Sequence, residues 1–163
     1  MKRPHLWMLV LAAAVLVVDQ ASKFWATSAL SDGTDITVIP GVIRFHLLLN
    51  SGAAFSMGEG VTWVFTLTAA VAVIGILYAG RRLRSPAWGV VLGALLGGAV
   101  SHLLDRLFRP PAFAQGHVVD LIDYGGLFVG NVADIALTGG CALLFLLSLR
   151  GVPFAGVEES PSR

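Results

Sequence analysis

Four long apolar segments dominate the pattern of hydrophobic and polar positions along the chain. They run over about residues 6–30, 61–80, 87–107 and 127–149. A helix needs about 20 mostly apolar residues to cross a bilayer, and each segment is close to that length. The pattern predicts an all-α membrane protein, a four-transmembrane-helix bundle, formed by a single domain over residues 1–150. The remaining residues, 151–163, are expected to form a disordered cytoplasmic tail.

A shorter pattern of β-branched residues lies between the first two spans. Two such runs flank Pro40-Gly41, which is a turn signal. We expect two strands, about 36–39 and 42–49, within a small β-element that covers about 34–58. This β-element should lie on the surface of the membrane.

Composition strengthens the membrane interpretation. Of 163 residues, 56% are hydrophobic and only 13% are charged, and the mean hydropathy is +0.79. A soluble domain of this length cannot bury so much apolar surface. The net charge of +1 gives no reason to expect a nucleic-acid partner, and the lone Cys141 excludes an internal disulfide.

The basic residues are distributed unevenly between the connections. Seven of the eleven lie at the N-terminus, in the turn between the second and third spans, or after the fourth span: Lys2, Arg3, Arg81, Arg82, Arg84, Arg150 and Arg163. The positive-inside rule therefore predicts that both termini and this turn are cytoplasmic. The β-element and the second long connection, a loop over about 107–126, should then be extracytoplasmic.

The N-terminus has a second interpretation. Its basic start and apolar run are also typical of a removable signal peptide, with ATSA (26–29) as a cleavage site. Charge distribution does not separate the two interpretations, because the later spans keep the same orientation in both.

Ionisable residues within the spans share one depth. At 1.5 Å per helical residue, Asp19 lies roughly 20 Å and Asp134 roughly 24 Å from the cytoplasmic face. Asp134 is the only charged residue within 127–149, and His102 and Arg106 lie near the outer end of the third span. Ionisable residues inside a membrane usually face a partner or a water-filled cavity, and they mark function. We therefore expect a site near the outer face.

The candidate chemistry is a pair of carboxylates, Asp120 and Asp134, that activates water to hydrolyse an amide. Two carboxylates about 3 Å apart share one proton, so one acts as general base and the other as general acid. The alternative is that Asp120 is a solvated loop acid and that Asp134 neutralises Arg106.

Other chemistries have weaker support in the sequence. Ser22 and Lys23 are neighbours on a helix and do not face each other, which argues against a serine–lysine dyad. Ser51 lacks the G-x-S-x-G pattern of a nucleophile elbow. No metal site is expected, because no short ligand spacing such as H-x-x-x-H occurs.

A different class of protein would be a small proton- or ion-coupled transporter or channel subunit. It would use Asp19, Arg106 and Asp134 as a relay. No chain of acids reaches the cytoplasmic face, which argues against this alternative. A non-catalytic assembly protein is a third alternative.

Five sequence blocks resemble, in the same order, those of the bacterial lipoprotein signal peptidases, also called signal peptidase II. They are VVDQASK (17–23), NSGAAFS (50–56), GGAVSHLLDRL (97–107), GHVVDLIDY (116–124) and VGNVADIALTGG (129–140). The resemblance extends over about residues 10–148 and implies that the first span is retained. It implies an aspartic peptidase of the bacterial inner membrane that needs no cofactor. Its partners would be membrane lipid and a lipid-modified prolipoprotein, cut just before the diacylglyceryl cysteine, and we expect a monomer.

The resemblance also assigns roles. By block matching, Asp120 and Asp134 are the catalytic pair. The other implied positions, which line the site, contact the substrate or support the structure, are Asn50, Arg106, Asn131, Asp19, Lys23 and Gly52. The chain departs from the family pattern at Ser101-His102, where Gly-Asn is usual. We expect activity to be kept, with a substrate contact at His102 that is altered or pH-dependent.

Overall fold

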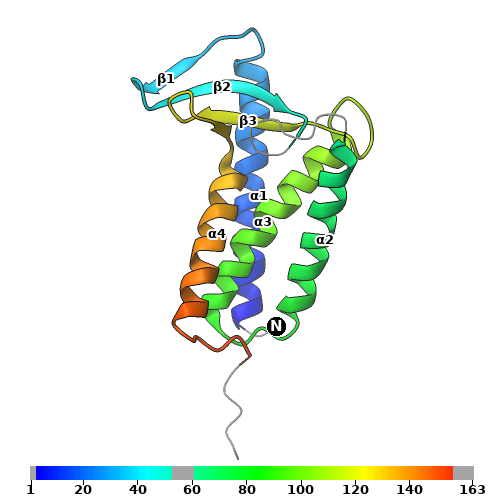
Figure 1. Cartoon of the computed structure of the whole chain (residues 1–163), viewed down its shortest axis with the longest axis vertical. Helices are drawn as coiled ribbons and strands as arrows, with labels where there is room; N and C mark the ends of the chain where they lie inside the picture. The colour runs from blue at the N-terminus through cyan, green and yellow to red at the C-terminus, as the bar shows by residue number, and fades with distance from the viewer. Residues whose placement is uncertain (1–2, 53–60, 156–163) are drawn as a thin grey trace, which may run out of the picture.

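The structure, a computed structural model, describes residues 3–52 and 61–155, and within these ranges four long helices carry a small sheet at one end (Figure 1). The helices are α1 (Arg3–Ala29), α2 (Thr62–Gly80), α3 (Pro86–Phe108) and α4 (Val132–Leu149). All four are long and apolar enough to cross a membrane. The predicted four-span architecture of a multi-pass membrane protein is confirmed.

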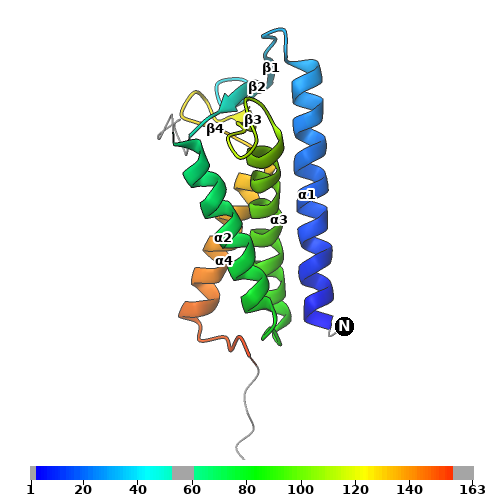
Figure 2. The ribbon, with the colours of Figure 1, turned by 90° about the vertical axis from the view of Figure 1, so that its right-hand side faces the viewer.

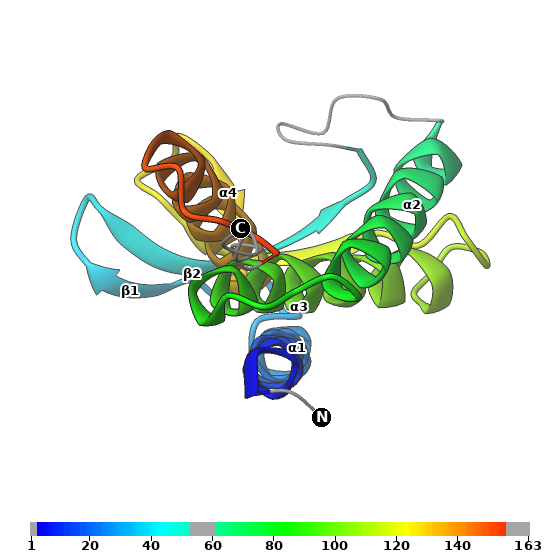
Figure 3. The ribbon, with the colours of Figure 1, turned by 90° about the horizontal axis from the view of Figure 1, so that it is seen from below.

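Helix α3 lies at the centre of the bundle, with α1 on one side and α2 and α4 on the other (Figures 2 and 3). Gly93 and Gly97 approach α1 closely: a Cβ at either position would lie 2.7 Å from the main-chain oxygen of Met8 or Ala12. Small residues of this kind let membrane helices pack backbone against backbone. Helices α2 and α4 leave long apolar faces exposed, as lipid-facing helices do.

The sheet joins the two long connections of the chain. Its strands are β1 (Ile36–Ile39), β2 (Ile43–Asn50), β3 (Val118–Asp123) and β4 (Val129–Gly130). They pair in that order, and every neighbouring pair is antiparallel. The β1–β2 hairpin agrees with the sequence prediction. The last part of the predicted β-element, residues 53–58, lies outside the described residues.

Strand β3 corrects the prediction of a loop over 107–126. The run VVDLID (118–123) is rich in β-branched and apolar residues, and a glycine pair follows it after Tyr124. A run of this composition that ends at a turn signal is typical of a strand. All but one of its residues are buried, so alternation of polar and apolar residues does not mark the strand. Asp120 is therefore held on a strand, where it pairs with Leu48 of β2.

Helix α4 begins at Val132, five residues later than predicted. The chain first makes β4, and Asn131 then caps the helix. The Asn131 side chain accepts a hydrogen bond from the backbone N–H of Asp134, and the Asp134 side chain accepts one from the backbone N–H of Asn131. This reciprocal capping box fixes Asp134 in the first turn of the helix.

The start of the C-terminal tail is ordered, contrary to the predicted disorder from residue 151. The Trp88 indole N–H donates to the main-chain oxygen of Val152 at 3.0 Å, and its ring makes a T-shaped contact with Phe154. Residues 156–163 lie outside the described part of the chain. Both described ends lie at the end of the bundle opposite the sheet (Figure 1).

Candidate active site

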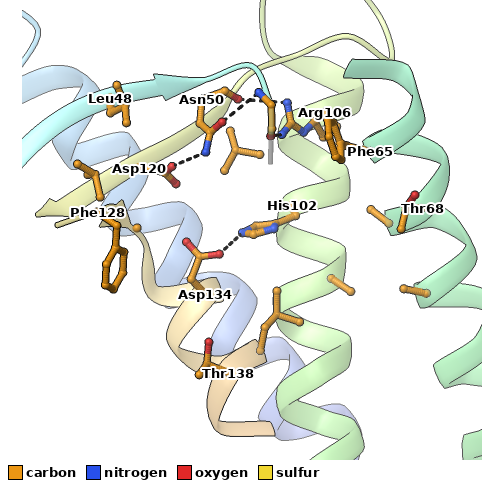
Figure 4. A pocket seen from close by; sticks show the side chains of 18 residues that line it. Leu48, Asn50, Phe65, Thr68, His102, Arg106, Asp120, Phe128, Asp134 and Thr138 are labelled. Carbon is orange, nitrogen blue, oxygen red and sulfur yellow. Dashed lines mark hydrogen bonds and ion pairs between the residues drawn. The ribbon is translucent and has the colours of Figure 1, made fainter. Parts of the chain in front are cut away.

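A cavity of about 670 Å³ lies beneath the sheet, with α2 and α4 on either side of it and α3 along its wall (Figure 4). This volume is within the range of small-molecule and peptide sites. Most of the lining is apolar. The ionisable and amide side chains of the lining gather near the sheet: Asn50, His102, Arg106, Asp120 and Asp134.

Asp120 is the buried acid of the cavity. Its side chain is almost inaccessible, with the residue 2% exposed. Asn50 Nδ2 donates to one carboxyl oxygen at 3.0 Å, and Asn131 Nδ2 donates to the other at 2.6 Å. Burial raises the pKa of the Asp120 carboxyl to about 6; the bond from Asn50 opposes this rise, and the charge of Asp134 adds to it. The alternative that Asp120 is a solvated loop acid is therefore wrong.

Asp134 is the more open acid, with 41% of its side chain exposed. Its Oδ2 accepts from the backbone N–H of Asn131 at 2.9 Å, and its Oδ1 lies 3.4 Å from His102 Nε2. Its position in the first turn of α4 also places it where the helix dipole favours negative charge. The ion-pair partner of Asp134 is His102 and not Arg106, so the alternative in which it neutralises Arg106 is wrong.

Asn131 connects the two acids. It is fully buried, its Nδ2 donates to Asp120, and its Oδ1 accepts from the backbone N–H of Asp134 at 3.0 Å. Among the described residues, no hydrogen bond joins the two carboxyl groups directly. The direct proton sharing predicted from the sequence is not seen, and the connection runs through one amide.

Arg106 organises the backbone at the end of β2. Its guanidinium donates to the main-chain oxygens of Asn50 at 3.1 Å, Ser51 at 3.0 Å and Gly116 at 3.2 Å, and also to that of Gly52. Gly52 in turn donates its N–H to the Asn50 side chain at 3.0 Å. Asn50 is therefore held in position to donate to the buried acid.

Asp19 and Lys23 lie on the opposite side of α3 and do not line the cavity. Both are fully buried, and Lys23 Nζ lies 2.6 Å from Asp19 Oδ2 and 2.7 Å from Asp105 Oδ2. Arg109 pairs with the same Asp105 at 2.7 Å. We call these four residues the α1–α3 charge cluster. Their two acids and two bases balance, which favours the structural one of the two roles, structural or substrate-contacting, that the resemblance implied for Asp19 and Lys23.

The α1–α3 charge cluster reaches the backbone next to each cavity acid. Asp19 Oδ1 accepts from the N–H of Ala133 at 2.8 Å, and Asp105 Oδ2 accepts from the N–H of Val119 at 3.4 Å. Ala133 and Val119 immediately precede the two acids in the chain. The cluster therefore helps to hold both acids in place.

Three contributors were not predicted from the sequence: Gln20, Asp105 and Phe65. Gln20 Nε2 donates to Asp105 at 3.0 Å, and Phe65 lines the cavity with its ring 5.5 Å from the Arg106 guanidinium. Gln20 and Asp105 are sequence neighbours of Asp19 and Arg106, which the sequence blocks had identified, so their position could have indicated them. Phe65 lies in a wholly uncharged span, where nothing in the sequence distinguishes it from its apolar neighbours.

The arrangement suits hydrolysis. One buried acid able to carry a proton near neutral pH and one exposed acid able to accept a proton face the same cavity, which is what general acid–base attack by water requires. Within residues 3–52 and 61–155, no group of three or more His, Cys, Asp or Glu side chains is placed to hold a metal ion. Fold and site together are those of a membrane-embedded hydrolase.

Comparison with known proteins identifies the family. The family model described as signal peptidase (SPase) II matches residues 11–150. The chain is 47% identical to the lipoprotein signal peptidase of Mycolicibacterium smegmatis over 94% of this chain and 65% of that protein. It is also 47% identical to that of Mycobacterium avium, over 90% and 81% of the two chains. The chain belongs to the signal peptidase II family and is therefore a membrane peptidase.

Solved structures agree with this fold. One bacterial membrane enzyme, determined by the in meso method at 2.3 Å resolution, matches with a TM-score of 0.79 at 24% identity and covers 96% of this chain and 93% of that one. A second, at 1.9 Å resolution, matches with a TM-score of 0.76 at 25% identity, over 88% and 92%. The transporter alternative has no support in these similarities.

Proposed function

We propose that the chain is an aspartic endopeptidase that removes the signal peptide from lipid-modified prolipoproteins, cutting before the diacylglyceryl cysteine. Asp120 and Asp134 are the catalytic pair. The observation that carries this proposal is that both acids line one cavity in contrasting environments. The relatives named lipoprotein signal peptidase support the choice of substrate.

The chemistry proceeds without a cofactor in this proposal. Asp134, as the carboxylate, takes a proton from water while the water oxygen attacks the scissile carbonyl carbon. Asp120, as the acid, gives its proton to the carbonyl oxygen. When the tetrahedral intermediate collapses, the C–N bond breaks, the leaving amine takes the proton held by Asp134, and one hydroxyl proton returns to Asp120. Both acids regain their starting forms.

The geometry of the cavity fits a substrate that stays in the bilayer. A signal helix lying against α2 and α4 would bring its scissile bond beneath the sheet, where Asn50, Gly52, Arg106 and His102 face it. The apolar lining suits acyl chains and small apolar side chains. All these residues come from one chain, so a monomer suffices.

The proposed location is the bacterial inner membrane, with both termini cytoplasmic and the active site near the outer face. The basic residues of the α2–α3 turn support this orientation. The described chain ends lie with that turn, opposite the sheet (Figure 1). A lipid-modified substrate presents its cleavage site at the same outer level.

A cell-free assay with a lipid-modified prolipoprotein tests the proposal. Asp120→Asn and Asp134→Asn should fold and insert but not cleave. The control is Asp35→Asn, an exposed residue that pairs with Arg44 and His46 outside the cavity, and it should cleave as the wild type does. Turnover at the wild-type rate by either cavity variant would remove that acid from the mechanism. A metal chelator should leave wild-type cleavage unchanged.

A further inference from the structure

The Asp134 carboxyl has a partner that the proposed chemistry does not use. His102, on α3, points its imidazole at Asp134 across the cavity (Figure 4). Its Nε2 lies 3.4 Å from Asp134 Oδ1 and 3.3 Å from Asn131 Oδ1. Distances at the long end of hydrogen bonding are common in unliganded active sites and shorten when substrate binds.

The surrounding contacts determine which His102 nitrogen carries a proton. Asn131 Nδ2 faces two acceptors, Asp120 Oδ1 and the main-chain oxygen of Val119, so this end of the amide is the donor. The Asn131 oxygen accepts from the backbone N–H of Asp134. The Asn131 oxygen can only accept from His102 Nε2, and so can the Asp134 oxygen when that carboxyl is charged; Nε2 must then carry hydrogen to bond to both, in the neutral and in the charged imidazole.

We infer that His102 is a positioning residue for Asp134: its Nε2–H holds that carboxyl as the charged, proton-accepting member of the pair and so leaves Asp120 to carry the proton. This inference rests on the proposed function. A hydrogen bond donated to a carboxylate stabilises its charged form and fixes its rotamer. With the backbone N–H of Asn131 on Oδ2, the bond from His102 gives each Asp134 oxygen a donor.

The other ionisable groups around His102 favour this assignment. Asp120 on β3 is the second acid of the cavity, and Arg106 lies one turn further along α3 with its guanidinium turned to backbone carbonyls. Tyr124, which follows β3, is not among the residues that line the cavity, and its pKa is raised by burial and by the charge of Asp134. The described residues of α2 contribute no charged side chain to the lining. Asp134 is thus the anion closest to His102.

The activity test compares three variants in the cell-free assay across pH 4 to 9. His102→Leu should lower kcat by about tenfold, with little change in KM, and should move the acid limb of the pH–rate profile to higher pH, because Asp134 loses a donor. His102→Asn keeps an N–H donor and should restore kcat and the position of the limb. His46→Asn, at the exposed pair with Asp35, is the matched control and should behave as the wild type does.

A spectroscopic measurement determines the protonation of His102 in the wild-type protein itself and uses a variant only to assign the signals. The chain has four histidines, and comparing ¹⁵N spectra of histidine-labelled wild type and His102→Asn assigns the His102 signals. At neutral pH the Nε2 signal should be that of a protonated nitrogen.

The outcomes separate the inference from the proposed function. An Nδ1–H tautomer at neutral pH would overturn the inference, as would a His102→Leu profile that superimposes on the wild-type profile, or an equal loss in His102→Leu and His102→Asn. In those cases the proposed function survives as long as Asp134→Asn is inactive. Cleavage by Asp134→Asn would overturn both.

Discussion

Helix α3 separates two groups of acids and bases that differ in how their charges are matched. On the α1 side, Lys23 is fully buried and has a carboxylate within 2.7 Å on each of two sides. On the cavity side, Asp134 is 41% exposed, and its nearest basic side chain is His102, 3.4 Å away. Arg106 also lines the cavity, but its guanidinium donates to main-chain oxygens and not to either acid.

Ionisable residues at membrane depth therefore have two different roles in this protein, one structural and one chemical. The α1–α3 charge cluster is neutral in total and bonded to backbone N–H groups, and its Asp19, Lys23 and Asp105 are buried, so it serves structure. The cavity has two acids and no base that fully neutralises them, so its protons are exchangeable. Both groups of ionisable residues lie at the same depth in the membrane, so depth alone does not distinguish them. The balance of charges within each group distinguishes the structural group from the chemical one.

The largest expected effect is on the cavity side. Asp120→Asn should reduce kcat/KM by on the order of 10⁴-fold, about 5.5 kcal/mol, because the proton donor is lost. Its thermal midpoint in detergent should change little, because removing a buried acid offsets the loss of one of the two amide hydrogen bonds that Asp120 accepts. A large loss of stability would contradict the contrast between the two sides.

The next effect is on the α1 side and has the opposite character. Lys23→Met leaves two buried carboxylates without their shared base and should cost about 3–5 kcal/mol of stability. Denaturation in detergent measures it, with the exposed Arg82→Met as control, expected to change stability by less than about 0.5 kcal/mol. Adding Asp19→Asn to Lys23→Met should recover part of the loss, since Asp19 is then the acid without a base, whereas Asp105 keeps its pair with Arg109.

A third effect tests the environment of the buried acid. Because the pKa of Asp120 is raised to about 6, its protonated form is lost as pH rises through that value. The mechanism needs this proton, so kcat/KM should fall on the alkaline side with a midpoint near pH 6, by about tenfold per pH unit above it. A profile that stays flat to pH 8 would remove Asp120 as the acid.

The smallest effect refines the description of the α1 side. Ser101 donates to Asp19 Oδ2 at 2.6 Å and accepts from Gln20 at 2.8 Å. Ser101→Ala removes both bonds and should lower stability by about 1–2 kcal/mol, with kcat unchanged. Thermal unfolding and the cleavage assay on one preparation measure both quantities. A fall in kcat larger than twofold would connect this side to the chemistry more closely than the contacts indicate.

Much of the fold could be predicted because membrane spans are long and uniformly apolar. The first two spans and the β1–β2 hairpin follow from the hydrophobic pattern and from Pro40-Gly41. Strand β3 could not be recognised in the same way, because it is buried along nearly its whole length and lacks alternation. The start of α4 was misplaced for a related reason: residues 127–131 are mostly apolar but form an irregular segment, strand β4 and the helix cap.

The sequence identified the residues of the site better than the contacts between them. Asp120, Asp134 and Asn131 were identified from sequence blocks, but the role of Asn131 as the link depends on a side-chain direction that no spacing reveals. The pair of Asp19 with Lys23 is accessible from the sequence, because the two lie four residues apart on one helix. It could not predict that Asp105, from another helix, binds the same lysine.

The cavity between α2 and α4 has a consequence for kinetics. Both helices present apolar outer faces, so a substrate anchored by acyl chains meets the enzyme by diffusing in two dimensions. The concentration that governs saturation is then the number of substrate molecules per lipid molecule. Adding inert lipid at constant protein and substrate should slow cleavage, whereas diluting the vesicles with buffer should not.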